Sequence, residues 1–197
     1  MVKMFSQPHK IEFSLPEWIN EYSLTYQTTN DLKERMKFVI QAAKINVEEK
    51  TGGPFAAAIF ETETGKLVSL GVNLVMTQGL SILHAEVVAI SVAQRKLGGY
   101  DLGAKSLPRH ELLTSTEPCA MCLGAIPWSG VKKMVTAAFD QDARNIGFDE
   151  GQKPIDWVAA LNERNIEVIR NIERDEAIKV MQLYSDSDNH IYNPREG

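Results

Sequence analysis

Cysteine is scarce in this chain, which has only two cysteines, Cys119 and Cys122, among its 197 residues. Two cysteines cannot build a disulfide framework, and a bridge between neighbouring positions would not close a long loop. Cysteine usage of this kind is typical of a reducing environment. We therefore expect an intracellular protein.

Long hydrophobic runs are also missing. No uncharged apolar stretch approaches the roughly twenty residues that a membrane helix requires. Residues 1–29 contain Lys10, Glu12, Pro16 and Glu17 in place of the continuous apolar segment of a secretory signal. We predict a cytoplasmic protein with no membrane partner.

Positive charge is in deficit, because 21 Lys and Arg residues stand against 26 Asp and Glu residues, for a net charge of −5. Binding to nucleic acid depends on basic side chains that contact phosphates, so this balance disfavours a nucleic-acid partner. Hydrophobic residues make up 44% of the chain and charged residues 24%, as in ordinary globular domains. The chain has no internal repeat and no low-complexity segment.

The apolar residues alternate between helical and strand periods. Strands are predicted at 55–61, 67–75, 111–116, 133–139 and 166–170, and helices at 32–47, 85–97, 120–128, 155–164 and 174–184. The first two strands flank turn residues and form a hairpin, and the next two enclose a helix and are therefore parallel. This pattern predicts an α/β fold, a three-layer α/β/α sandwich with a mixed sheet of about five strands. We expect an irregular N-terminal extension at 1–29, one domain at 30–184 and a polar C-terminal tail at 185–197.

Two short motifs carry the chemistry. His84-Ala85-Glu86 begins one predicted helix, and Pro118-Cys119-Ala120-Met121-Cys122 begins another. Alone, an HxE pair is usually a surface or capping feature, and a CxxC pair could be a redox motif. Together they match the signature of zinc deaminases, in which one imidazole and two thiolates hold Zn²⁺ and a glutamate that is not a ligand moves protons.

The spacing explains how this site would work. Cys119 and Cys122 lie three positions apart at a helix start, so both sulfurs project to one side, and His84 supplies a third zinc ligand. Three protein ligands leave the fourth tetrahedral position open, as in catalytic sites. Glu86, two residues after a ligand, is the candidate catalytic acid and base.

A closed structural zinc site would need a fourth ligand. The remaining imidazoles are those of His9, His110 and His190, and each lies in a segment that we interpret as a loop or extension. We therefore favour the open, catalytic site.

These motifs identify the chain, over about residues 31 to 150, as similar to the cytidine deaminase-like superfamily, and within it to the bacterial guanine deaminases. Four local strings resemble guanine deaminases in particular. They are Gly52-Gly53-Pro54-Phe55, Gly71-Val72-Asn73, Ile126-Pro127-Trp128 and Gly147-Phe148-Asp149-Glu150. The N-terminal extension and Pro127 depart from the shortest members of that family.

The resemblance implies a zinc-dependent deaminase domain at 30–184, a homodimer, and hydrolysis of guanine to xanthine and ammonia. We call residues 147–150 the acidic loop. The resemblance implies that Glu150, at the end of this loop, handles the 2-amino group of guanine as a second catalytic residue. It also implies that the tail containing Tyr192 can cover an active site, that of the other subunit included. The substrate-binding set expected on this basis is Phe55, Asn73, Ala85 and Trp128.

The residues alone leave alternatives open. Asn73 could be a turn residue, Phe55 and Trp128 could belong to the core, and Glu150 could lie in a solvated loop. Among functions, a related amino heterocycle such as ammeline or cytosine, or adenosine in tRNA, remains an alternative substrate. A non-catalytic, zinc-stabilised interaction domain is a further alternative, although such a domain has no use for Glu86.

Overall fold

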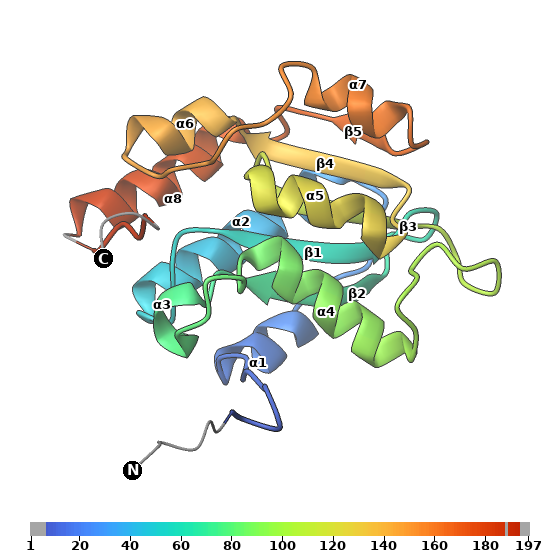
Figure 1. Cartoon of the computed structure of the whole chain (residues 1–197), viewed down its shortest axis with the longest axis horizontal. Coiled ribbons are helices and arrows are strands. Elements are labelled where there is room, and N and C mark those ends of the chain that lie inside the picture. Colours follow the sequence, from blue (N-terminus) through green and yellow to red (C-terminus); the bar gives the residue numbers. More distant parts are fainter. Residues whose placement is uncertain (1–6, 188, 194–197) are drawn as a thin grey trace, which may run out of the picture.

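A computed structural model describes residues 7–187 and 189–193 of the chain. Its centre is one mixed sheet of five strands in the order β2-β1-β3-β4-β5 (Figure 1). The strands are β1 (Ala56–Glu61), β2 (Leu67–Val72), β3 (His110–Thr116), β4 (Lys133–Ala138) and β5 (Glu167–Ile169). Strand β1 is antiparallel to β2 and β3, whereas β3, β4 and β5 are parallel. The predicted hairpin and the predicted parallel pair are both confirmed.

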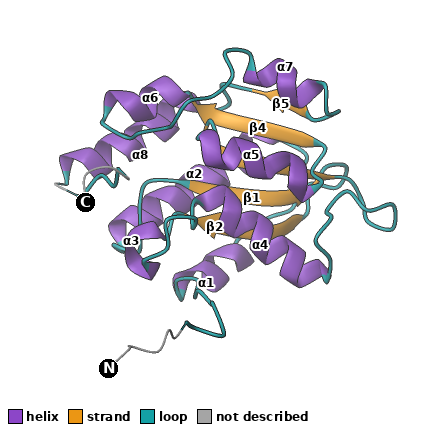
Figure 2. Cartoon of the chain, viewed as in Figure 1, coloured by secondary structure: helices purple, strands orange, loops and turns teal. Residues whose placement is uncertain are grey.

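Helices cover both faces of the sheet (Figure 2). The long helices are α2 (Leu32–Glu48), α4 (Ala85–Leu97), α5 (Ala120–Ser129) and α8 (Arg174–Asp186). The shorter ones are α1 (Trp18–Leu24), α3 (Val75–Gln78), α6 (Asp140–Asn145) and α7 (Trp157–Asn162). Among the described residues, no helix has both the length and the apolar character needed to cross a membrane.

The core has two halves because side chains along a strand alternate between the faces of the sheet. Ala56, Ala58 and Phe60 of β1 pack in the half that contains buried residues of α2 and α8. Ala57 and Ile59 pack in the other half, with buried residues of α4, α5 and α7. The three-layer α/β/α architecture predicted from the sequence is therefore confirmed.

Gly71 on β2 allows α4 to lie close to the sheet. A Cβ atom at this position would lie 2.4 Å from the backbone nitrogen of Ala89 and 2.6 Å from the carbonyl oxygen of Ala85. Any larger residue would push α4 away from β2. Since α4 begins directly after His84, this glycine also helps to place the first motif.

Three local predictions were wrong. Residues 18–24 form a helix, where we expected an irregular extension, and the short helices α3 and α6 were not predicted. Helix α1 has no side-chain cap, but Trp18 and Tyr22 pack edge to face and Tyr22 stacks on Phe38 of α2 at 4.6 Å. Tertiary packing thus stabilises a helix of seven residues that local sequence does not signal. His110, expected in a loop, is the first residue of β3 and is buried.

Candidate active site

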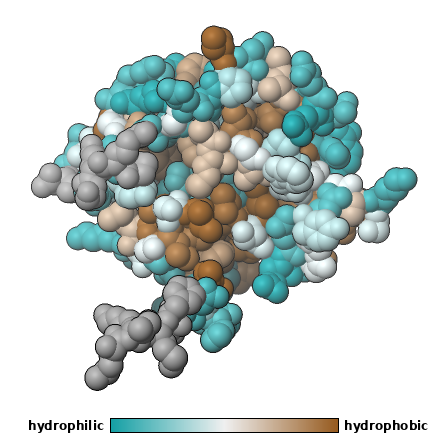
Figure 3. Space-filling model, viewed as in Figure 1, coloured by the Kyte–Doolittle hydropathy of each residue, from teal (hydrophilic) through white to brown (hydrophobic). Residues whose placement is uncertain are grey.

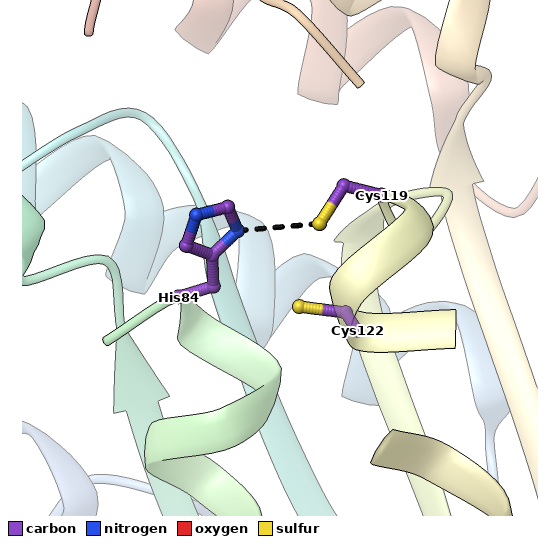
Figure 4. Close-up of side chains that lie close together, drawn as sticks. All are labelled: His84, Cys119 and Cys122. Carbon is purple, nitrogen blue, oxygen red and sulfur yellow. Dashed lines mark hydrogen bonds between the residues drawn. The ribbon is translucent and has the colours of Figure 1, made fainter. Parts of the chain in front are cut away.

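The two motifs meet where α4 and α5 begin. His84 is the N-cap residue of α4 and Cys119 is the N-cap residue of α5, both with extended backbone conformation. Neither side chain caps its own helix, so both point away from the helices toward each other (Figure 4). Cys122, one turn into α5, points into the same space (Figure 4). The chain folds this way because β3 ends at Thr116 and the turn to α5 carries the cysteines over the end of the sheet.

The three side chains have the geometry of a zinc site. Their candidate ligand atoms all lie within 4.8 Å of one another, and Nδ1 of His84 lies 3.4 Å from Sγ of Cys119. A tetrahedral zinc ion with ordinary Zn–N and Zn–S bonds separates these two atoms by about 3.5 Å. Among the described residues no other group of this kind is found, and His9, His110 and His190 are not members of it. The donor set therefore fits Zn²⁺ with three protein ligands and one open position.

The two thiols have opposite shifts in pKa. Hydrogen bonding with Cys122 lowers the pKa of Cys119 to about 4, and the neighbouring His84 contributes in the same direction. The same hydrogen bond, together with burial, raises the pKa of Cys122 well above its ordinary value. Burial lowers the pKa of His84, but its hydrogen bond and attraction to Cys119 outweigh this, so the net shift is upward. The pKa of Cys119 is thus shifted in favour of the thiolate, the form in which cysteine binds zinc.

Glu86 lies in the first turn of α4, next to the cysteine cluster. Its side chain is buried, and the thiol of Cys122 donates a hydrogen bond to Oε2 at 3.3 Å. Burial, reinforced by the negative charge of Cys119, raises the pKa of Glu86 to about 7. A carboxyl group with such a pKa can both accept and return a proton near neutral pH.

A cavity of about 340 Å³ opens in front of these groups. It is lined by seven of the site residues expected from the sequence, namely Phe55, Asn73, His84, Ala85, Glu86, Cys119 and Glu150. The structure therefore brings together in one cavity residues that lie almost a hundred positions apart in the sequence.

Glu150 comes from the loop between α6 and α7. It is buried, and its backbone carbonyl accepts a hydrogen bond from the Ala120 amide at 2.9 Å, which ties the loop to the start of α5. Burial, followed by the negative charges of Cys119 and Glu86, raises the pKa of Glu150 to about 8. The site therefore contains two buried carboxyl groups that are protonated more readily than ordinary ones.

Aromatic side chains form one wall of the cavity, but not the set that we expected. Phe55 packs edge to face on Phe148 at 4.9 Å, and Phe148 stacks on Tyr184 at 6.1 Å. Both partners line the cavity, and sequence reasoning did not select them as binding residues. Trp128 is 85% exposed and does not line this cavity, because it lies two turns along α5, about 12 Å from the helix start.

The C-terminal tail lies against its own chain's cavity. The side chain of Asn193 accepts a hydrogen bond from the Asp149 amide at 2.8 Å and donates one to the Gly147 carbonyl at 2.9 Å. The hydroxyl of Tyr184 donates to the carbonyl of His190 at 2.6 Å. His190 and Tyr192 thereby become part of the cavity lining. Residues 188 and 194–197 of the expected tail lie outside the described part of the chain.

Comparison with known proteins agrees with this geometry. The chain is 40% identical over 115 residues to guanine deaminase of Bacillus subtilis, which covers 58% of this chain and 69% of that protein. It is 37% identical over 105 residues to the tRNA-specific adenosine deaminase of the same organism, covering 53% of this chain and 60% of that protein. The solved guanine deaminase of Nitrosomonas europaea superposes with a TM-score of 0.87 at 38% identity, over 92% of this chain and all of that chain.

The fold and the ligand set define a zinc-dependent deaminase, an enzyme that hydrolyses an amino group from its substrate. More particularly, residues 29–138 match the cytidine and deoxycytidylate deaminase zinc-binding region, and the chain belongs to that family.

Proposed function

We propose that this enzyme hydrolyses guanine to xanthine and ammonia, in purine metabolism. The observation that carries the proposal is the presence of two buried carboxyl groups, those of Glu86 and Glu150, in the cavity that is also lined by the zinc ligands His84 and Cys119. The extended similarity to guanine deaminases from two organisms supports guanine over the other amino heterocycles. The net charge of −5 argues against tRNA as the substrate.

The proposed reaction forms a bond between C2 of guanine and the oxygen of a water molecule, and breaks the bond between C2 and the amino nitrogen. Zinc, held by His84, Cys119 and Cys122, would supply the Lewis acidity that makes water nucleophilic near neutral pH. Glu86 accepts the proton that water loses and returns it to a ring nitrogen next to C2. Glu150 donates the proton with which the amino nitrogen leaves as ammonia, and regains a proton from the water-derived hydroxyl.

Substrate binding is assigned to Phe55, Asn73 and Ala85. The amide of Val75 donates to Oδ1 of Asn73 at 3.2 Å, which fixes the orientation of the side-chain amide. The NH₂ group of Asn73 is then the natural donor to O6 of guanine. Phe55, braced by Phe148, offers a ring on which the planar base can stack, and Ala85 leaves room for the base beside Glu86.

We further propose that the enzyme is a cytoplasmic homodimer. Large hydrophobic side chains are exposed on α3 and α5 and in the turn between α3 and α4: Met76 (50%), Ile82 (55%), Met121 (39%) and Trp128 (85%). Figure 3 shows hydrophobic side chains gathered on the face formed by α3, α4 and α5. Covering such a face with a second copy would remove it from water. In this arrangement, residues 30–184 form the catalytic domain and the tail of each subunit completes a cavity.

The test is an ammonia-release assay of the zinc-loaded protein with guanine, adenine, cytosine, ammeline and tRNA, with xanthine identified by chromatography. We expect turnover of guanine with a kcat/KM at least about tenfold above that for any other substrate. Turnover of another substrate without guanine would refute the proposal, and release of ammonia only from tRNA would reassign the enzyme. Light scattering of the same preparation tests the dimer, and a monomer at micromolar concentration would contradict it.

A further inference from the structure

A buried lysine lies behind the acidic loop. The side chain of Lys153 is only 7% exposed, although lysine is among the residues that are least often buried. Its Nζ atom lies 2.7 Å from Oδ1 of Asp140 and donates a hydrogen bond to the carbonyl of Pro118 at 2.7 Å. The same ammonium group lies 5.8 Å from the centre of the Trp157 ring. The ammonium group thus has a carboxylate and a backbone carbonyl as polar partners.

These contacts connect two parts of the active site. Pro118 directly precedes the zinc ligand Cys119, and Lys153 follows Glu150 by three positions. The loop from 147 to 154 has no helical or strand hydrogen bonding. It is held by separate contacts, among them the bond from the Gly151 amide to Oδ1 of Asp149 and the bond from the Ala120 amide to the Glu150 carbonyl, both at 2.9 Å. Lys153 therefore fastens the loop that carries Glu150 to the turn that carries Cys119.

Neighbouring contacts tighten the same loop. The guanidinium group of Arg144 donates to the carbonyl of Gly151 at 2.6 Å and to Oδ2 of Asp140 at 2.7 Å. Asp140 is thus shared between Arg144 and Lys153. Because Arg144 still pairs with Asp140 when Lys153 is replaced, loss of the lysine should loosen the loop without leaving Asp140 unpaired.

We propose that Lys153 is a positioning residue for Glu150: it holds the acidic loop against the Pro118 turn, so that the Glu150 carboxyl keeps a fixed place relative to the zinc ligands. This proposal deepens the proposed function and rests on the assignment of Glu150 to the chemical step. A displacement of about 1 Å at a reacting group can reduce the rate by roughly a hundredfold. The effect of losing Lys153 should therefore appear in kcat and not in binding.

The experiment compares Lys153→Met with Lys105→Met. Methionine keeps an unbranched stem against Trp157 and removes the charge, while Lys105 is an exposed lysine outside the site. We expect Lys153→Met to keep its zinc and its melting temperature within a few degrees, to lose about tenfold to a hundredfold in kcat on guanine, and to change KM less than about threefold. Lys105→Met should behave as wild type. A kcat within twofold of wild type in Lys153→Met would overturn the proposal.

A double-mutant cycle separates positioning from general damage. If Lys153 acts through Glu150, then adding Lys153→Met to Glu150→Gln should reduce kcat no further. If Lys153→Met reduced kcat by the same factor in wild type and in Glu150→Gln, the lysine would act independently of Glu150. If Lys153→Met does not fold, Lys153→Leu carries the same tests, since it also removes the donor to the Pro118 carbonyl and the charge beside Asp140 while keeping an apolar side chain against Trp157.

Hydrogen exchange provides a readout that does not depend on the substrate. Amides of residues 147–153 should exchange faster in Lys153→Met than in Lys105→Met or wild type, and unchanged exchange would contradict the anchoring role. A wild-type enzyme that is inactive on guanine would refute the proposed function alone. In that case exchange still decides whether Lys153 fastens the loop.

Discussion

The side-chain amide of Asn46 is hydrogen-bonded to the backbone carbonyl of Asn73 at 3.0 Å. Asn46 is fully buried on α2, and its amide also donates to the carbonyl of Gly53 at 2.8 Å. Thr51 donates to Oδ1 of Asn46 at 2.7 Å and accepts from the indole nitrogen of Trp18 at 3.1 Å. The N-terminal helix α1 is therefore connected, through two intermediate side chains, to the edge of the cavity where Asn73 lies.

Asn46→Ala should destabilise the edge of the cavity at Asn73, because the substitution leaves the carbonyl groups of Gly53 and Asn73 without their buried donor. We expect the free energy of unfolding to fall by about 1–3 kcal/mol, and KM for guanine to rise more than kcat falls. Denaturant unfolding and steady-state kinetics measure the two effects. Asn162→Ala, at an exposed position, is the control. Unchanged stability and KM would show that the network is dispensable.

Zinc content tests the metal ligands. Cys119→Ser and Cys122→Ser should each purify with far less than the single zinc ion per chain expected of wild type, because a serine hydroxyl is a poor substitute for a thiolate. Elemental analysis of the proteins gives the answer directly. Full occupancy in both variants would require a different set of ligands.

The role of Glu86 is tested by Glu86→Gln, which keeps the shape of the side chain but cannot carry the proton. We expect a folded, zinc-loaded protein whose activity is lower by about two to four orders of magnitude. Zinc analysis is the essential control, since simultaneous loss of the metal would make Glu86 a ligand. Near-normal turnover would remove it from the mechanism.

Glu150→Gln tests the second carboxyl group. The variant should retain zinc and its melting profile, and should lose at least roughly a hundredfold in guanine deamination, mainly in kcat. The reason is that the leaving amino group needs a proton while Glu86 serves the water and the ring. Unchanged kcat would return Glu150 to the status of a structural residue and reopen substrates that need no second acid.

The ion pair of Asp142 with Arg174 predicts a pH-dependent contribution to stability. Arg174 donates two hydrogen bonds to this carboxylate, at 2.7 and 2.8 Å, and thereby lowers the pKa of Asp142. A lowered pKa stabilises the folded state above the unfolded value of about 3.9, and this contribution disappears as the pH falls through the folded value. At pH 7, Asp142→Asn should lower the free energy of unfolding by only about 1 kcal/mol, because solvent screens the exposed Arg174.

Denaturant unfolding at several pH values measures this difference. We expect the stabilities of wild type and Asp142→Asn to converge progressively as the pH falls from about 4 through the lowered pKa of Asp142, since the carboxyl group of the folded wild type becomes protonated only there. Glu163→Gln, at an exposed position, should show no comparable difference. A gap that stays constant down to pH 2 would mean that packing, and not charge, accounts for the loss.

The zinc ligands could be found from the sequence because each motif is short and its spacing is fixed by the first turn of a helix. The periodicity of apolar residues also depends only on residues that are close together in the sequence, and it predicted the sheet and its two layers of helices. Lys153, Asn46 and Phe148 were missed because their roles depend on partners far away in the sequence. Helix α1 was missed for the same reason, since aromatic contacts with α2 stabilise it.

The residues of the tail that line the cavity are synthesised after the metal ligands. Ribosomes synthesise a chain from its N-terminus, and domains can begin to fold as they emerge. His84, Cys119 and Cys122 all precede Tyr192 and Asn193, the residues that complete the cavity wall and fasten it to the acidic loop. The metal ligands can therefore assemble while the cavity is still open on that side.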